Sequence, residues 1–307
     1  MPTDAPLKVR IGFGLGTRTA SVQDGSLGSL VDALDGGGWD SLWLSEQLGG
    51  PAPDPLVALS WAAGRTERLK LGTAVAVVPG RNPVVLAKQM ASLDRLSGGR
   101  FLPAVGLGAV RPAEQSAFGV QRAERAPWFD EALGLMRRLW TEGEVTHRGE
   151  RFVVEGLRPG PRPAQDPLEV WLGGRAPSEL RRVGRLGDGW LPSFCTPAEV
   201  DAGWKVVTGT AADHGRVIDP QHLGALVPYA WAPPPGEVRA AFEARRPGVG
   251  LDDVLPVGPA ALRLLLERFV AVGASKFVLV PLVEPAGPGG WAEELSRLAD
   301  AVLDLQT

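Results

Sequence analysis

The chain has 307 residues, a formal net charge of −3 at pH 7, 44% hydrophobic residues and 22% charged residues. These values are typical of a soluble globular protein, so they exclude wholesale disorder and argue against binding to nucleic acids or anionic membranes. The single cysteine, Cys195, excludes an internal disulfide framework and a multi-cysteine metal site. The start lacks the apolar core of a signal peptide, and no window holds the ~18 uninterrupted apolar residues of a membrane span, which predicts a cytoplasmic protein.

Apolar, β-branched segments alternate with segments of helical periodicity along the chain. The predicted strands cover residues 7–13, 41–44, 69–78, 101–105, 170–172, 189–192, 222–231 and 276–281. The predicted helices cover residues 27–34, 56–63, 83–96, 128–140, 177–183, 198–210, 260–272 and 291–305. Residues 145–146 and 151–154 flank a polar turn and predict a surface hairpin, and the proline-rich stretch 232–236 predicts a loop or insertion. Eight strand–helix units in a chain of this length predict an α/β fold, a (β/α)8 TIM barrel forming a single domain over residues 1–307.

In a parallel barrel the chemistry takes place at the carboxyl ends of the strands, and glycine occurs at three of the predicted ends. The first strand runs into a glycine-rich stretch at 12–16, the fourth into Gly106 and Gly108, and the fifth into Gly173 and Gly174. Glycine at these points lets a flat ligand or a phosphate approach the backbone. The alternative is that these glycines only allow the chain to turn tightly between a strand and a helix.

The loop after the fifth predicted strand gives the most informative chemical signal. Gly173 and Gly174 precede Arg175, Ala176 and a helix with Pro177 in its first turn. Such a helix start directs free N–H groups and the positive end of the helix dipole outwards, which predicts a phosphate site at residues 173–176. The G-x-G-x-x-G spacing is not found after the first or fourth strand, which disfavours a dinucleotide-binding fold.

Four stretches resemble, in the same order, the bacterial-luciferase-like flavin and deazaflavin oxidoreductases. They are the run at 81–108 (RNPVVLAKQMASLDRLSGGRFLPAVGLG), Glu114 with 117–119 (AFG), the run at 129–140 (FDEALGLMRRLW) and the run at 170–192 (VWLGGRAPSELRRVGRLGDGWLP). The resemblance extends over about residues 8–305 and weakens between about 205 and 255.

This resemblance implies a (β/α)8 barrel with FMN or coenzyme F-420 at the carboxyl ends of the strands. It implies hydride transfer to or from the ring of that cofactor, with a small organic substrate above the ring; the family's FMN monooxygenases also react the reduced cofactor with oxygen. The peptide Ala74–Val75 is expected to be cis, in a bulged third strand that backs the ring. The implied cofactor-binding residues are Ala74, Val75, Gly106, Gly108, Glu114, Gly173, Gly174, Arg175 and Ala176.

The end of the second predicted strand departs from the family's pattern. The family commonly has an acid followed by histidine there, whereas this chain has Glu46 followed by Gln47. Glutamine has no proton to exchange near neutral pH, so we expect catalysis without a central histidine base, and Glu46 and Gln47 are the candidate catalytic residues. The missing histidine keeps open an alternative, a non-catalytic flavin- or ligand-binding barrel. A phosphate-binding isomerase or hydrolase ranks last, since no Lys, His or paired-carboxylate catalytic set is apparent.

Several single residues have a structural interpretation beside a functional one. Glu46 either contacts cofactor or substrate or stabilises its loop, and Glu114 either faces the cofactor or caps its helix. Arg81 either meets an anionic group or packs onto Asp94 or Asp130. Structural roles are favoured for Cys195, His147 and His222, and the candidates to line a ring pocket are Trp43, Trp190 and Trp231.

The expected partners are a small-molecule substrate and a second copy of the chain. The predicted helix 83–96 has apolar residues on more than one face. Together with the frequent dimers of the resembling family, this predicts a homodimer that uses the helices flanking the second to fourth strands.

Overall fold

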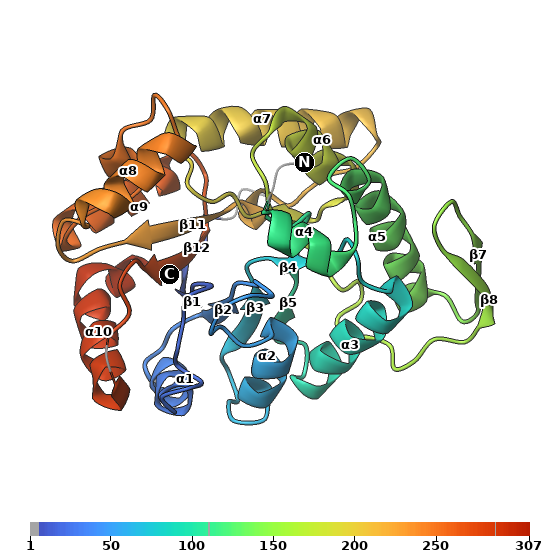
Figure 1. Cartoon of the computed structure of the whole chain (residues 1–307), viewed down its shortest axis with the longest axis horizontal. Coiled ribbons are helices and arrows are strands. Elements are labelled where there is room, and N and C mark those ends of the chain that lie inside the picture. Colours follow the sequence, from blue (N-terminus) through green and yellow to red (C-terminus); the bar gives the residue numbers. More distant parts are fainter. Residues whose placement is uncertain (1–5, 110, 286) are drawn as a thin grey trace.

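The computed structural model describes residues 6–109, 111–285 and 287–307, and its strands lie at the centre of a ring of helices (Figure 1). All eight predicted strand segments contain strands, and the third and fourth are each interrupted once. The barrel strands are β1 (Arg10–Leu15), β2 (Ser41–Leu44), β3 (Lys70–Thr73) continued by β4 (Ala76–Val77), β5 (Phe101–Leu102) continued by β6 (Ala104–Gly106), β9 (Trp171–Leu172), β10 (Gly189–Trp190), β11 (Gly224–Tyr229) and β12 (Lys276–Pro281).

The strands follow one another around the barrel in parallel. One sheet has the order β11-β12-β1-β2-β3-β5, and the other has the order β10-β9-β6-β4. The interrupted strands β3/β4 and β5/β6 pass from the first sheet into the second, and parallel bridges from Trp190 to Leu223 and from Ser193 to Leu226 connect β10 with β11. These pairings describe the ring of a (β/α)8 barrel and confirm the predicted fold class.

Eight helices follow the barrel strands in chain order around the ring (Figure 1). They are α1 (Leu27–Gly36), α2 (Pro55–Ala63), α3 (Pro83–Leu96), α5 (Arg125–Thr141), α6 (Pro177–Leu186), α7 (Pro197–Asp213), α9 (Pro259–Ala271) and α10 (Gly287–Val302). Short 3-10 turns occupy Pro220–His222, Leu251–Asp253 and Leu303–Leu305. Over the ranges that the structure covers, every helix is too short or too polar to cross a bilayer.

One hairpin and two further helices lie outside this ring. The predicted hairpin is present as β7 (Val145–Arg148) and β8 (Val153–Leu157), and it projects from the barrel beyond α5 (Figure 1). Two helices were not predicted: α4 (Pro112–Phe118), between β6 and α5, and α8 (Gly236–Arg245), which begins where the sequence predicted a loop or insertion.

Side-chain caps set the starts of two helices beside the second and third barrel strands. Asp54 Oδ1 accepts the N–H of Val57 at 3.0 Å, and Asn82 Oδ1 accepts the N–H of Val84 at 2.9 Å. Each cap is followed by proline, whose missing N–H would have no helical acceptor at that position. The loops that follow β2 and β4 therefore end at defined points.

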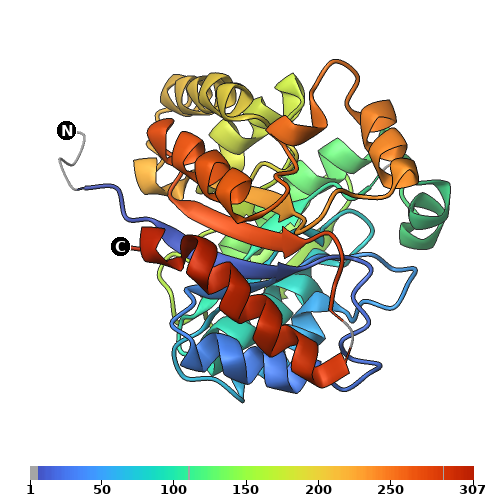
Figure 2. The ribbon, with the colours of Figure 1, turned by 90° about the vertical axis from the view of Figure 1, so that its left-hand side faces the viewer.

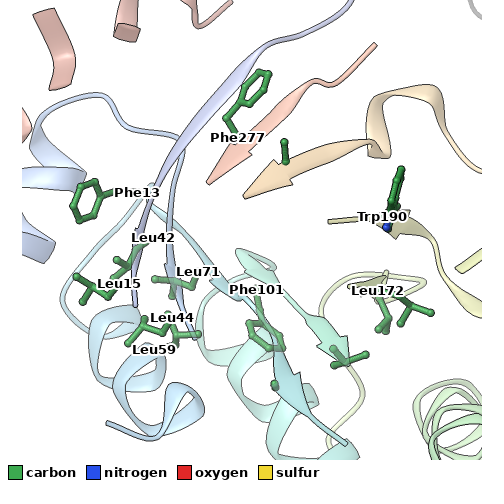
Figure 3. Close-up of a cluster of buried hydrophobic side chains, with 14 of the residues drawn as sticks. Phe13, Leu15, Leu42, Leu44, Leu59, Leu71, Phe101, Leu172, Trp190 and Phe277 are labelled. Atoms are coloured by element: carbon green, nitrogen blue, oxygen red, sulfur yellow. The ribbon is translucent and has the colours of Figure 1, made fainter. Parts of the chain in front are cut away.

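The strands contribute to two apolar clusters, because their side chains alternate between the barrel interior and the surrounding helices. The outer cluster packs strands against helices and includes Phe13, Leu42, Leu71, Phe101 and Phe277 (Figure 3). Figure 2 shows α10 lying across the paired strands β1 and β12. The inner cluster of Trp43, Ala104, Trp171, Leu191 and Val278 fills the barrel interior.

A buried ion pair lies at the amino ends of the strands. Asp40 precedes β2, and its carboxylate is bonded to the ammonium groups of Lys276, at the start of β12, and of Lys70, at the start of β3. Burial favours the neutral form of Asp40, but Lys276 and Lys70 hold the pKa of its carboxyl at about 2. Burial also lowers the pKa of Lys276 to about 8, against the opposing charge of Asp40. This end is packed for stability, so the opposite end is the candidate site.

Candidate functional site

Three strand ends meet at the side chain of Val75, at the carboxyl end of the barrel. Residues 74 and 75 separate β3 from β4, and the Ala74–Val75 peptide is cis, as expected. A Cβ added to Gly106 would lie 2.8 Å from Val75 Cγ2, and one added to Gly173 would lie 3.1 Å from Val75 Cγ1. A side chain at Gly106 would therefore clash with Val75, and one at Gly173 would crowd it. The break between β3 and β4 and the ends of β6 and β9 thus meet in one apolar surface, where Val75, Gly106 and Gly173 are each partly exposed.

Ser45 fixes the backbone of this surface, and sequence reasoning did not single it out. It follows β2 directly, and its hydroxyl donates to the carbonyl of Ala74 at 2.9 Å. Thr73, at the end of β3, donates its hydroxyl to the carbonyl of Ala104 at 2.7 Å and accepts the N–H of Ala104 at 3.0 Å. Two short polar side chains therefore hold the interrupted third strand against its neighbours.

Glu46 is buried beside the same segment, with its side chain only 3% exposed. One carboxylate oxygen accepts the N–H of Val77 at 2.6 Å, and the other is paired with the guanidinium of Arg81. Burial raises the pKa of Glu46, although Val77 and Arg81 both oppose that shift. Arg81 also lies 3.6 Å from Asp54, so it pairs with neither Asp94 nor Asp130, the partners the sequence suggested.

Hydrogen bonds connect the loop that follows β2 to α4. Glu114 is 8% exposed, and its carboxylate accepts the N–H groups of Leu48 and Gly49, each at 3.2 Å. Gln47 accepts a hydrogen bond from Arg111 at 2.5 Å and donates to the carbonyl of Gly49 at 2.6 Å. Glu114, in the first turn of α4, therefore connects that helix to the loop after β2, and Gln47 connects the same loop to Arg111, the residue before α4.

A single buried arginine holds the loop after β6. Arg125, at the start of α5, is 6% exposed, and its Nη1 lies 3.0–3.2 Å from the carbonyl oxygens of Leu107, Gly108 and Ala109. Gly108 has a φ of +80°, which glycine adopts without strain. The next residue of this loop, Val110, is outside the described residues. Arg125 thus fixes the path of residues 107–109.

The predicted phosphate loop has the expected shape but differs in one respect. The N–H groups of Arg175 and Ala176 were expected to be free, whereas both donate to Glu179 Oε2, at 2.9 and 2.8 Å. Gly174 has a φ of +105°, and its carbonyl accepts a hydrogen bond from Trp190 at 2.8 Å. This helix start does bind an anionic oxygen, but the oxygen belongs to the chain itself. The N–H groups of Arg175 and Ala176 therefore fit an anionic group. A phosphate that binds there has to displace the Glu179 carboxylate or lie beside it.

The cysteine and two of the histidines have structural surroundings. Burial raises the pKa of the Cys195 thiol to about 11, in keeping with the structural role favoured for it. His222 precedes β11 at the amino end of the barrel, with Nδ1 2.9 Å from the carbonyl oxygen of Asp188. His147 lies in the hairpin, 3.0 Å from Glu131. Neither of these two histidines therefore reaches the carboxyl ends of the strands.

The tryptophans near strand ends are used in packing. Trp43 fills the barrel interior and donates its indole N–H to Ser41 at 2.8 Å. Trp231 donates to the carboxylate of Glu294 at 2.8 Å. Of the three named from sequence, Trp190 makes a direct contact with the predicted phosphate loop.

A family model described as luciferase-like monooxygenase matches residues 12–303, nearly the whole chain. The chain belongs to the luciferase-like monooxygenase family. Among curated relatives, it is 33% identical to the F420-dependent glucose-6-phosphate dehydrogenase of Kineococcus radiotolerans, over 56% of this chain and 54% of that one. It is also 33% identical to the 4-hydroxyprotoasukamycin monooxygenase of Streptomyces nodosus subsp. asukaensis, over 62% and 54%. The matches span about half the length of these relatives.

A solved structure agrees with the fold of this luciferase-like chain along its full length. The oxygenating constituent of 3,6-diketocamphane monooxygenase from Pseudomonas putida, in complex with FMN, has a TM-score of 0.76 to this chain. Its sequence is 19% identical, and the match covers 99% of each chain. At that identity the likeness supports the barrel architecture alone.

Proposed function

We propose that this luciferase-like chain is a flavin- or deazaflavin-dependent oxidoreductase that acts on a small organic substrate. The observation that carries the proposal is the apolar surface where Val75 meets Gly106 and Gly173, next to a helix start that binds an anionic oxygen. A flat ring with a phosphate on its side chain matches both features. The relatives support this class, because one is named for F420 and one solved neighbour contains FMN.

In this proposal the ring lies on Ala74 and Val75 and contacts the backbone at Gly106 and Gly108. Glu114 holds the β2 loop beside it. The phosphate is held at Gly173, Gly174, Arg175 and Ala176. When bound, the cofactor would supply the ring atom that gives or takes hydride, a carbon in F-420 and a nitrogen in FMN, or, with FMN, a reduced ring that reacts with oxygen.

Hydride transfer depends on the alignment of donor and acceptor atoms more than on a proton carrier. The protein's contribution is therefore a rigid backing surface, which Ser45, Thr73 and Arg125 hold in place. Where a proton has to move, the proposal assigns it to Glu46, whose burial raises its pKa towards the working range. Gln47 orients the β2 loop and contributes no proton.

The proposal includes a homodimer formed through α2 and α3. Four large apolar side chains on these two helices are exposed: Val57, Trp61, Val85 and Leu96. The helices pack against each other and flank the second to fourth strands of the barrel. Burial of this surface against a second copy would remove apolar area from water.

A second candidate is a non-catalytic barrel that binds the cofactor or another flat ligand. The observation in its favour is that both oxygens of Glu46 already have partners and that Gln47 replaces the family's histidine. Such a protein would keep the ring surface and the phosphate loop but would have no redox turnover.

Titration of the purified protein with FMN and with F-420, followed by stopped-flow spectroscopy, separates these candidates. The proposal expects one cofactor to bind at micromolar concentration or tighter, and its ring to change redox state when alcohols, aldehydes or ketones are added. Binding of a cofactor with no redox change across that substrate panel, under air and under nitrogen, would favour the second candidate. Binding of neither cofactor would contradict the proposed oxidoreductase and would restrict the second candidate to a flat ligand other than FMN or F-420.

A further inference from the structure

Glu179 occupies the anion position at the start of α6. Its Oε2 accepts the N–H groups of Arg175 and Ala176, at 2.9 and 2.8 Å. Ala176 precedes the helix and has no side-chain oxygen that could cap it, so the Glu179 carboxylate fulfils that role for the loop. Any phosphate that binds these two N–H groups has to displace the carboxylate or lie beside it.

The same carboxylate covers the glycine that a ligand would approach. A Cβ added to Gly174 would lie 2.8 Å from Glu179 Cβ, Cδ and Oε2. The opposite side of this peptide is fixed, since Trp190 donates to the carbonyl of Gly174. Glu179 is therefore packed directly against the accessible backbone of the predicted phosphate loop.

The charge of this carboxylate is not neutralised by an ion pair within the described ranges. Glu199 takes the equivalent third position of the next helix, α7, and provides a comparison. It also accepts the N–H of the residue before its helix, Thr196, but it is paired with Arg246 at 2.7 Å. Glu179 makes no such pair in the described part of the chain, and it presents a negative charge where a negative ligand is expected.

The phosphates of the two candidate cofactors differ in charge. FMN ends in a phosphomonoester, which is close to doubly ionised near neutral pH because its second pKa is about 6. The phosphate of F-420 is a diester and carries one charge. Coulomb repulsion from a fixed carboxylate scales with the ligand's charge, so Glu179 opposes the monoester about twice as strongly as the diester.

We propose that Glu179 is a specificity-determining residue that disfavours the phosphomonoester of FMN and thereby favours the phosphodiester of F-420. The inference rests on the proposed function, because it concerns the phosphate loop of that site. It goes beyond it by choosing between two cofactors that the fold and the family leave open.

The test compares wild type with Glu179→Gln, which removes the charge and keeps an oxygen that accepts the two N–H groups. Dissociation constants are measured for FMN and F-420, and for their phosphate-free counterparts riboflavin and 8-hydroxy-5-deazariboflavin. We expect the variant to tighten FMN about tenfold and F-420 about threefold, and to leave both phosphate-free ligands unchanged. Glu150→Gln is the charge control, since that side chain is 86% exposed in the hairpin and should change none of the four constants.

The outcomes are distinguishable. If riboflavin and FMN bind and Glu179→Gln leaves their affinity ratio unchanged, or weakens FMN, the inference is wrong while the proposed function stands. If none of the four ligands binds wild type or variant, the proposed function fails and the inference fails with it. Should Glu179→Gln unfold, which thermal melting would reveal, Glu179→Ala takes its place with the same expected rise in FMN affinity over riboflavin.

Discussion

Glu46 has both carboxylate oxygens occupied, one by the N–H of Val77 and one by Arg81. If Glu46 moves a proton during turnover, Glu46→Gln should lower the single-turnover rate about 10²–10⁴-fold and leave cofactor affinity nearly unchanged. If Glu46 only supports the loop, the same variant should lower the melting temperature and leave the rate per folded molecule intact. Measuring both quantities on cofactor-loaded protein separates the two roles, and a reaction that includes a proton transfer is expected to give the first result.

Asp54→Asn is the matched control for that experiment. It removes the other carboxylate near Arg81, which lies 3.6 Å away, and keeps both hydrogen bonds of Glu46; the lost Asp54 charge is one of the smaller causes that raise the pKa of Glu46. Asparagine still caps α2, so the helix start is preserved. A rate loss in this variant as large as that of Glu46→Gln would mean that Arg81, and not the Glu46 carboxyl, is what turnover depends on.

Arg125 carries a prediction about the loop after β6. Arg125→Met keeps an apolar stem of similar length but leaves the carbonyls of Leu107, Gly108 and Ala109 without their donor. Since hydrogen bonds to a charged group contribute about 1.5–3 kcal/mol, we expect the free energy of unfolding to fall by that amount and cofactor affinity to weaken. Urea unfolding and cofactor titration measure the two effects. Arg122→Gln, an exposed position three residues earlier, should change neither.

Local sequence predicts the position of some site residues, whereas the position of others depends on contacts between distant parts of the chain. Gly106, Gly173 and the cis peptide at Ala74–Val75 follow from strand-end glycines and from the family resemblance. The occupation of the phosphate loop by Glu179 carried a signal that was overlooked, since a glutamate three residues after a helix cap is half of a capping box. The Glu46–Arg81 pair spans 35 residues, and only the folded barrel brings it together.

Among the secondary-structure elements, those with a clear apolar period were predicted and those without one were not. All eight barrel strands are buried on both faces and therefore read as apolar runs. The helix α4 has seven residues, too few to show a 3.6-residue repeat, although Pro112 and Gly119 mark its ends. In α8 the described side chains are mostly exposed, so no apolar stripe distinguishes it from a loop. Elements that do not contribute to the core leave little pattern in the sequence.

The ion pair between β2 and β12 gives a prediction about stability. Asp40→Asn leaves the Lys276 ammonium buried without its partner, with a side chain only 3% exposed. Removing one member of a buried pair costs about 3–5 kcal/mol, so urea unfolding should show a loss of that size. The double variant Asp40→Asn/Lys276→Met removes both charges and should recover most of it. A double variant no more stable than Asp40→Asn would contradict the assignment.

The same pair predicts a pH dependence. Because Lys276 and Lys70 hold the pKa of Asp40 at about 2, below its ordinary 3.8, the folded protein binds fewer protons there than the unfolded chain. The resulting stability is present above pH 4 and is lost as the pH falls through about 2. Its size is on the order of 2 kcal/mol. Wild type minus the double variant should lose that much between pH 5 and 2, whereas a difference independent of pH would be inconsistent with the pair.

The two ends of the barrel have different tasks in the molecule as a whole. At the amino end, buried charges are paired, and the nearby histidine is held by a backbone carbonyl. At the carboxyl end, the backbone of the described loops is held in place by the polar side chains of Ser45, Thr73 and Arg125. This division explains why substitutions at Asp40 are expected to change stability alone, whereas substitutions at Glu179 are expected to change ligand affinity.

The assembly of two copies is predicted through α2 and α3, where Trp61 is 47% exposed and Val85 is 54% exposed. Placing charges in a buried apolar interface is costly, so Trp61→Glu/Val85→Glu should convert a dimer into a monomer while the fold persists. Light scattering at micromolar concentration measures the mass, and circular dichroism checks the fold. Val217→Glu, at a position 94% exposed in the loop that precedes β11, should leave the mass unchanged. A wild type that is already monomeric would refute the dimer, and a double variant that stays dimeric would move the interface away from these helices.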